Sequence, residues 1–310
     1  GLRVIGAEEE RMSANLSVAS VVIITHDRPD DLAKCLESVE RQTAGEIEII
    51  VVDNASTDNT LEMLAQRFPQ VRVYPSKVNL GVSQGRNVGI EMASHEVCVC
   101  IDDDAVFASD DAVRQAINYF ESDPGLASVA MTILSSATGE EERKGIPRLD
   151  KKVLDRDYEC TYFCGAGFAV RRSMFLEAGT FWAPLVYGSQ ELDLSYRFLD
   201  RGWRLVHSAG IRVIHKSSPL ARPSGQWVYF NTRDRSWVAI RHLPWPAVVT
   251  TTLLWWGQTF WASLWTGTCG SFFRGLAASL GGMGEAYRTR RLISREAIEQ
   301  LRSKSGRYWY

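Results

Sequence analysis

The sequence predicts an α/β fold whose central sheet is mostly parallel, and two observations support this prediction. Short β-branched runs alternate with amphipathic stretches of helical spacing from Val18 to Asp102. Polar residues then follow directly on three of these β-branched runs. Such alternation places helices on both faces of a parallel sheet, and ligands of these sheets bind beyond the carboxyl ends of the strands. We therefore expect a binding site at that edge.

The expected elements follow one another in regular order. The expected strands are residues 20–25, 47–53, 71–75 and 97–102, and the expected helices are residues 29–42, 58–68 and 81–93. The strands end in Thr25, in Asp53 and in the triplet Asp102, Asp103 and Asp104. Residues 111–219 mix helices and strands less regularly, so we expect them to extend the same sheet.

Composition excludes several classes of protein. The chain has 310 residues, of which 45% are hydrophobic and 23% are charged, as in soluble globular proteins. Its net charge of −2 gives no overall basic field, so we expect no nucleic acid among its partners. The six cysteines are too widely spread for a disulfide scaffold and indicate a cytosolic protein. Residues 1–17 contain no apolar stretch typical of a secretory signal, and we expect a mobile leader there.

The acidic triplet is the strongest sign of chemistry. Three adjacent carboxylates repel one another unless a positive group neutralises them. Mg²⁺ or Mn²⁺ is the natural candidate, because it binds one or two carboxylates and completes its shell with phosphate oxygens and water. A solvated acidic turn or a helix cap is the alternative. The first strand runs into Thr25 and His26 without a Gly-x-Gly-x-x-Gly turn, which excludes a Rossmann dinucleotide site.

Several motifs, taken in order, resemble those of family-2 glycosyltransferases of the GT-A fold. The motifs are residues 20–28, 50–58, 79–89, 102–104, 164–172 and 191–197. The resemblance covers about residues 18–240. It implies the GT-A fold and an inverting transfer of a hexosyl or deoxyhexosyl group from a nucleoside-diphosphate sugar to an acceptor hydroxyl. A nucleotidyltransferase of similar fold and an inactive sugar-binding scaffold are the alternative functions.

The resemblance assigns five residues to the donor. Thr25 and Asp53 match positions that contact the base and the ribose, although Asp53 also fits a cap of the following turn. Arg86 matches a donor-side motif, with an ion pair as the alternative. Asp102 matches a position that faces the ribose or the sugar, and Asp103 belongs to the same donor-binding group.

The remaining assignments concern the metal and the base. Asp104 matches the direct metal ligand, and His215 matches a histidine that completes the metal shell in some members. Glu191 matches the base that takes the acceptor proton, with Asp193 as the second candidate. Asp193 and Arg197 stand at helical i and i+4 positions, so an ion pair is their simpler interpretation.

The C-terminal region differs from the rest in composition. Residues 244–273 carry no charge, are rich in tryptophan, and precede several arginines. Tryptophan with flanking arginine is typical of the membrane interface. We therefore expect these residues to form a helix that lies in the membrane interface. Residues 229–237 resemble a segment of bacterial family members that build cell-surface polysaccharide. This resemblance implies a peripheral protein on the cytoplasmic face of the cell membrane that acts on a saccharide or lipid-linked acceptor. Packing of these helices against the catalytic domain, or a homodimer, is the alternative.

The expected domain organisation has three parts after the leader. Residues 18–110 form the nucleotide-sugar-binding half of the catalytic domain, and residues 111–220 form its acceptor-side half. Residues 221–310 form the tryptophan-rich helical region.

Overall fold

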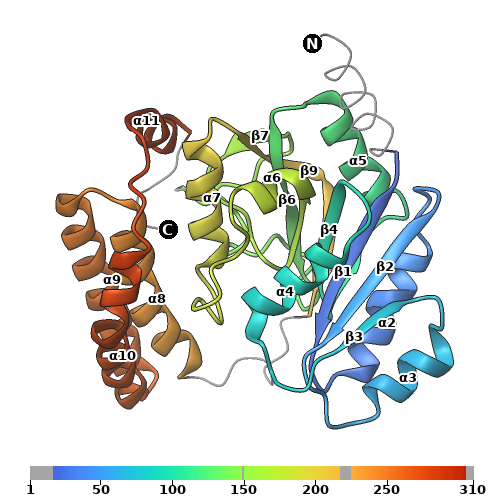
Figure 1. The fold of residues 1–310 in the computed structure, drawn as a ribbon, viewed down its shortest axis with the longest axis horizontal. Helices are drawn as coiled ribbons and strands as arrows, with labels where there is room; N and C mark the ends of the chain where they lie inside the picture. The colour runs from blue at the N-terminus through green and yellow to red at the C-terminus, as the bar shows by residue number, and fades with distance from the viewer. Residues whose placement is uncertain (1–16, 149, 217–224, 305–310) are drawn as a thin grey trace.

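The computed structural model describes residues 17–148, 150–216 and 225–304 of the chain. The leader expected over residues 1–17 lies, apart from its last residue, outside the described residues. The seven strands and helices expected between residues 20 and 102 are confirmed to within two residues at each end. Figure 1 shows a central sheet with helices on both faces and a group of C-terminal helices at one side.

The strands of the described residues form one nine-stranded sheet in the order β3-β2-β1-β4-β8-β6-β9-β5, with β7 paired to β9. The strands are β1 (Ala19–Thr25), β2 (Ile47–Asp53), β3 (Arg72–Pro75), β4 (Val97–Asp102), β5 (Ala105–Phe107), β6 (Leu126–Ser135), β7 (Tyr158–Cys160), β8 (Gly167–Arg171) and β9 (Arg204–His215). Strands β1 to β4 pair in parallel. The second half is mixed, since β8 runs antiparallel to β4 and β6. β8 follows β6 with no described helix between them, and parallel pairing requires such a crossover.

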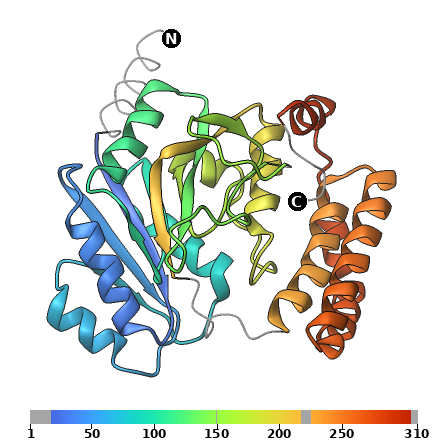
Figure 2. The same ribbon diagram turned by 180° about the vertical axis from the view of Figure 1, so that it is seen from behind.

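The helices cover both faces of the sheet and continue beyond it. They are α2 (Pro29–Glu40), α3 (Thr60–Arg67), α4 (Gly81–Met92), α5 (Ala112–Ser122), α6 (Arg172–Glu177), α7 (Gln190–Asp200), α8 (Gln226–His242), α9 (Trp245–Trp265), α10 (Cys269–Arg288) and α11 (Arg295–Ser303). Figures 1 and 2 show α2 and α5 on one face, and α4, α6 and α7 on the other.

Alternation along each strand creates a hydrophobic core on each face. Val21 and Ile23 of β1 join the core under α2, α3 and α5. Val22, between them, joins the core that includes side chains of α4, α6, α7 and α8. Successive side chains of a strand point to opposite faces, so one buried strand supplies both cores. Both faces of the sheet are thereby packed behind its carboxyl edge.

The register of the strands brings the polar strand ends together. Thr25 at the end of β1 stands opposite Asp53 at the end of β2, and β4 ends at Asp102 on the other side of β1. The short β5 runs antiparallel to β9, and its first residue, Ala105, stands opposite His215. The acidic triplet between β4 and β5 therefore meets a histidine that follows it by more than a hundred residues.

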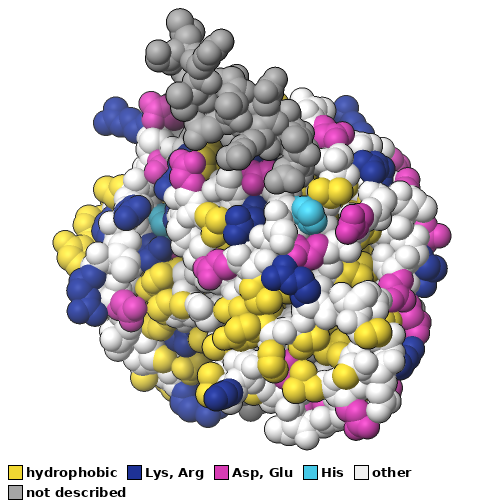
Figure 3. Space-filling model, turned by 45° about the vertical axis from the view of Figure 1, so that its right-hand side comes forward, with side chains coloured by type: hydrophobic (Ala, Val, Ile, Leu, Met, Phe, Trp, Pro, Cys, Tyr) yellow, Lys and Arg dark blue, Asp and Glu magenta, His cyan; other side chains and the backbone are white. Residues whose placement is uncertain are grey.

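Helices α8, α9 and α10 pack together, and we call them the C-terminal bundle. Both ribbon views show the bundle beside α7, on the side of the molecule away from α2 and α3 (Figures 1 and 2). Within the described residues, no helix combines the length and the apolar character that a membrane crossing requires. On the face drawn in Figure 3, Lys and Arg side chains are interspersed with Asp and Glu rather than gathered in one basic patch.

Candidate active site

A cavity of about 720 Å³ opens at the carboxyl edge of the parallel strands. Its wall combines the residues after β1, the acidic triplet, the end of β9, and the first turns of α4 and α8. The side chains that line it include Thr25, Arg28, Asn54, Asn79, Asp102, Asp103, Asp104, Tyr187, His215, Lys216, Gln226 and Phe230. A cavity of this size, with carboxylates and cations on its wall, can hold a charged ligand such as a nucleotide sugar.

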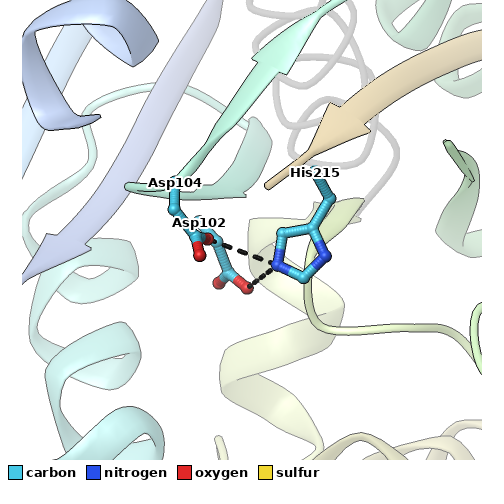
Figure 4. A group of neighbouring side chains, drawn as sticks. All are labelled: Asp102, Asp104 and His215. Atoms are coloured by element: carbon cyan, nitrogen blue, oxygen red, sulfur yellow. Dashed lines mark ion pairs between the residues drawn. The ribbon is translucent and has the colours of Figure 1, made fainter. Parts of the chain in front are cut away.

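Asp102, Asp104 and His215 offer three ligand atoms that lie within 4.8 Å of one another. Nε2 of His215 lies 3.3 Å from Oδ1 of Asp104 and 3.8 Å from Oδ2 of Asp102, and Figure 4 shows the imidazole pointing at both carboxylates. Nδ1 of His215 faces Glu142 at 3.4 Å. A proton held on Nδ1 by Glu142 leaves a lone pair on Nε2, as a metal-binding histidine needs. Two carboxylates and an imidazole suit Mn²⁺ well.

The charges around His215 favour its protonated form. Burial by itself lowers the pKa of His215, but the hydrogen bond to Asp104 and the charges of Asp102, Asp104 and Glu142 raise it further than burial lowers it. The pocket therefore stabilises a positive charge at this place. The same carboxylates would stabilise a divalent cation bound at this place.

Asp103 turns toward β1 and is held by two partners. Thr25 Oγ1 donates a hydrogen bond to Oδ2 of Asp103 at 2.9 Å, and Nη1 of Arg28 lies 3.0 Å from Oδ1. Arg28 also lies 3.6 Å from Oδ2 of Asp104. Burial raises the pKa of Asp103 to about 7 despite Arg28. Partial protonation near neutral pH reduces the repulsion within the triplet.

Arg86 links the acidic triplet to α7. Its guanidinium contacts Oδ1 of Asp102 at 2.7 Å, Oε1 of Glu191 at 3.0 Å and the carbonyl of Gly165 at 2.5 Å. A Cβ at Gly165 would overlap Oε1 of Glu191, so this close approach requires glycine. Arg86 is 4% exposed and Glu191 is 5% exposed, and neither side chain lines the cavity. The ion pair, which was the alternative for Arg86, is present, and direct contact of Arg86 with the donor stays a prediction.

Glu191 lies in the first turn of α7 and is buried beside Arg86. Nε2 of Gln190 donates a second hydrogen bond to its Oε1 at 2.8 Å. Burial raises the pKa of Glu191, although Arg86 opposes the shift. A carboxylate with a raised pKa is a stronger base, which is what removal of a proton from a sugar hydroxyl requires.

Asp193 occupies a different environment, and its assignment as second candidate for the base needs correction. Its carboxylate has no exposed surface and contacts Arg197, Arg241 and His242, each at 2.7 Å. Burial alone would raise the pKa of Asp193, but Arg197, His242 and Arg241 hold it well below its usual range. A carboxylate enclosed by two arginines and a histidine cannot reach an acceptor. The ion pair predicted between Asp193 and Arg197 is confirmed.

Asp53 is buried just behind the cavity. Its Oδ2 accepts a hydrogen bond from the backbone N–H of Ser56 at 3.2 Å, as expected for a cap of the following turn. Its Oδ1 is buried and has no hydrogen-bond partner among the described residues. A buried acceptor without a donor is costly. A ligand N–H or hydroxyl would supply that donor.

Several residues of the cavity escaped the sequence analysis. Arg28 directly follows the polar end of β1 and Lys216 directly follows His215, so their positions beside strand ends were a usable signal. Lys216 forms an ion pair with Asp31 at 2.7 Å. Tyr187 and Phe230 pack with their ring centroids 5.5 Å apart on the cavity wall. Phe230 belongs to α8, and no pattern in the sequence indicated that the tryptophan-rich region reaches the cavity.

The fold and the site together define a transferase that handles a nucleotide-linked group at an acidic strand end. The sequence model of Glycosyl transferase family 2 matches residues 20–179. The chain belongs to this family. It is therefore a glycosyltransferase with a nucleotide-sugar donor, as the motifs implied. Glu191, Asp193 and His215 lie beyond the matched residues, so their roles depend on the geometry described above.

Similar proteins support this membership. The amylovoran biosynthesis glycosyltransferase AmsE of Erwinia amylovora is 29% identical over 217 residues, which are 68% of this chain and 80% of AmsE. The uncharacterised glycosyltransferase YibD of Escherichia coli is 38% identical over 92 residues, which are 28% of this chain and 26% of YibD.

Solved structures show the same fold at low identity. A mannosyltransferase from Pyrobaculum calidifontis, in complex with GDP-Man and Mn²⁺, superimposes with a TM-score of 0.55 at 17% identity, over 92% of this chain and 78% of the other. GalNAc-T7 with UDP, GalNAc and Mn²⁺ gives a TM-score of 0.63 at 17% identity, over 93% of this chain and 58% of the other. The predicted GT-A fold with a C-terminal helical region is confirmed.

Proposed function

We propose that the protein transfers a sugar, with inversion at the anomeric carbon, from a nucleoside-diphosphate sugar to a saccharide hydroxyl, assisted by Mg²⁺ or Mn²⁺. The observation that carries the proposal is the convergence of Asp102, Asp104 and His215 within a cavity at the carboxyl edge of the parallel strands. The Mn²⁺ in both solved relatives supports the choice of ion class. Asp102 thus joins Asp104 and His215 as a metal ligand in this proposal.

The donor occupies the cavity with its diphosphate near the acidic triplet. A bound divalent cation supplies a Lewis acid that balances the charge of the departing diphosphate. Arg28 and Lys216 line the same wall and add positive charge around the phosphates. Asp53 accepts a hydrogen bond from the nucleoside through its unpaired Oδ1, and Thr25 orients Asp103.

Glu191 is the base. It takes the proton from the acceptor hydroxyl while that oxygen bonds to the anomeric carbon and the bond from this carbon to the diphosphate breaks. Attack opposite to the leaving group inverts the configuration. Arg86 orients Glu191 relative to Asp102, because one guanidinium contacts both carboxylates. The relation to AmsE, a biosynthesis enzyme of the polysaccharide amylovoran by name, favours a saccharide acceptor, free or linked to lipid.

The proposal is tested with a panel of nucleotide sugars in Mn²⁺, in Mg²⁺ and in EDTA. We expect slow release of a nucleoside diphosphate from one donor, stimulated by the metal, and a product of inverted anomeric configuration by ¹H NMR. With pyrophosphate added to the same panel, formation of a nucleoside triphosphate and a sugar 1-phosphate would indicate the nucleotidyltransferase alternative. Retained configuration would contradict the role of Glu191 as base, and full turnover in EDTA would contradict the metal site.

A further inference from the structure

The C-terminal bundle buries many hydroxyl side chains and exposes many large apolar ones. On α9, the side chains of Thr251, Thr252, Thr259 and Ser263 are buried. Large apolar residues of the same helix are exposed, including Trp261 at 62% and Trp265 at 78%. A helix on the surface of a water-soluble protein has the opposite arrangement.

Small residues and buried hydrogen bonds hold the bundle together. A Cβ at Gly282 would overlap the ring of Trp237 on α8, so α10 and α8 approach as closely as glycine allows. Oγ1 of Thr232 in α8 donates a hydrogen bond to Oγ1 of Thr259 in α9 at 2.9 Å. The hydroxyl groups of Ser236 in α8 and Ser279 in α10 form another hydrogen bond at 2.5 Å. Helices that associate in an apolar environment use small residues and hydrogen bonds in this way, because burial of large apolar side chains gains them nothing there.

Large apolar residues are exposed on both α9 and α10, and we call them together the outer face. It includes Leu253, Trp261 and Trp265 of α9 and Phe273, Leu280 and Tyr287 of α10. Tyr287 stacks on Trp245 at the start of α9, with ring centroids 6.2 Å apart. At 3.6 residues per turn, the exposed apolar positions of α9 cover roughly half of its circumference. Such an area is too broad for the groove of one neighbouring helix.

The C-terminal region and the rest of the chain have net charges of opposite sign. Residues 221–310 contain 12 Lys and Arg against 4 Asp and Glu, a net charge of +8. Residues 1–220 contain 23 against 33, a net charge of −10. Residues 244–273, which include α9, carry no charge, and Arg274, Arg288 and Arg291 follow them along α10 and just beyond it. Apolar side chains beside exposed cations match an anionic lipid surface.

We infer that the outer face of α9 and α10 docks on an anionic lipid surface, with both helices lying in the interface. Their aromatic and aliphatic side chains enter the boundary between headgroups and acyl chains, and Arg274, Arg288 and Arg291 meet the lipid phosphates. A symmetric dimer would bring the same positive region of two copies together, and this repulsion disfavours a second copy as the occupant. The inference does not depend on the proposed reaction, because lipid binding requires neither donor nor metal.

Vesicle sedimentation tests the inference. The full chain should sediment with phosphatidylglycerol vesicles at low salt, and at least about tenfold less tightly with phosphatidylcholine vesicles or at high salt. Combined substitution Leu253→Ser, Trp261→Ser and Trp265→Ser should release it while the melting temperature and the oligomeric state stay unchanged. The matched control, Leu61→Ser, Val78→Ser and Val153→Ser, also removes three exposed apolar side chains and should still bind.

A second measurement needs no variant. Brominated phosphatidylglycerol vesicles should quench the tryptophan fluorescence of the wild-type protein, since bromine on the acyl chains quenches only rings that reach them. Failure of the wild type to sediment with phosphatidylglycerol, or sedimentation without quenching, would overturn the inference. So would a wild-type dimer that the Leu253, Trp261 and Trp265 substitutions split, because the outer face would then bind a second copy.

Discussion

The carboxyl edge of the sheet and the C-terminal bundle follow opposite rules of construction. At the edge, apolar strands lie inside and polar strand ends face a cavity, as in most water-soluble α/β proteins. In the bundle, hydroxyl groups and glycines are buried beside Trp237 and Trp255, and many large apolar side chains face outward. The edge is built to bind a charged ligand from water, whereas the bundle is built for an apolar surrounding.

The two regions meet at α7. Glu191, in its first turn, joins the cavity side through Arg86 and Asp102, and Asp193, two residues later, joins α8 through Arg241 and His242. Neighbouring carboxylates on one helix therefore have separate tasks, one in the chemistry and one in attachment of the bundle. Substitutions at these positions can show whether the two tasks are separable.

The largest effect is expected at Asp193. Asp193→Asn leaves Arg197 and Arg241 buried without their counter-charge, so the free energy of unfolding should fall by about 3–5 kcal/mol. The folded-state pKa of Asp193 lies below its ordinary value of 3.8, so its carboxylate stabilises the protein above that value and loses this effect as the pH falls through the folded-state pKa. Urea unfolding should thus show the difference at pH 7 and a smaller one in acid. An unchanged midpoint at pH 7 would refute the attachment role.

At the cavity edge, Asp104→Asn should reduce turnover by about a thousandfold in Mn²⁺, because an amide does not supply the negative charge that holds the cation near the diphosphate. The melting temperature should stay near that of the wild type. Asp110→Asn removes an exposed carboxylate that does not line the cavity, and serves as the control. Turnover of both variants at the wild-type rate would remove Asp104 from the metal site.

Glu191→Gln should lower kcat by about a hundredfold or more, with little change in donor affinity, because it removes the base and keeps its shape. Arg86 keeps Asp102 as its ion-pair partner in this variant. Steady-state kinetics with Glu121→Gln as an exposed control measures the effect. A raised KM at unchanged kcat would make Glu191 a binding residue instead.

The smallest effect compares two neighbouring glycines of α10. Gly282→Ala forces a methyl group against Trp237 and should cost about 1–3 kcal/mol of stability. Gly281 has open space around it, so Gly281→Ala should be neutral or stabilising by up to about 1 kcal/mol. Thermal unfolding of both variants tests the close packing of the bundle, which equal melting temperatures would contradict.

Periodicity in the sequence predicted the first half of the fold because its signals are local. The strand ending at Asp102 and the helix beginning at Gly81 each carry their own pattern of apolar residues, and both are confirmed within one residue. The mixed second half of the sheet was not predicted, since strand direction depends on connections that no local pattern encodes. His215 was placed by motif resemblance, and the structure adds that it lies beside Asp102 and Asp104.

Long-range packing explains what the sequence could not supply. Helical spacing alone showed Asp193 and Arg197 as a pair, but the partners that enclose Asp193 come from α8, almost fifty residues away. In the same way, the tryptophans of α9 looked alike in sequence. Trp255 is in fact buried in the bundle, and Trp261 is exposed, because they lie about 120° apart around one helix.

The central claim is that a divalent cation at Asp102, Asp104 and His215 holds the donor in the cavity. Calorimetric titration with nucleoside diphosphates tests this claim most directly. Uridine, guanosine and thymidine diphosphates are titrated into the wild-type protein and into Asp104→Asn, in Mn²⁺ and in EDTA. We predict that one of them binds the wild type at least about tenfold more tightly in Mn²⁺ than in EDTA, a difference of about 1.4 kcal/mol. The variant should lose this difference. Equal affinity of the wild type in Mn²⁺ and in EDTA would contradict the account.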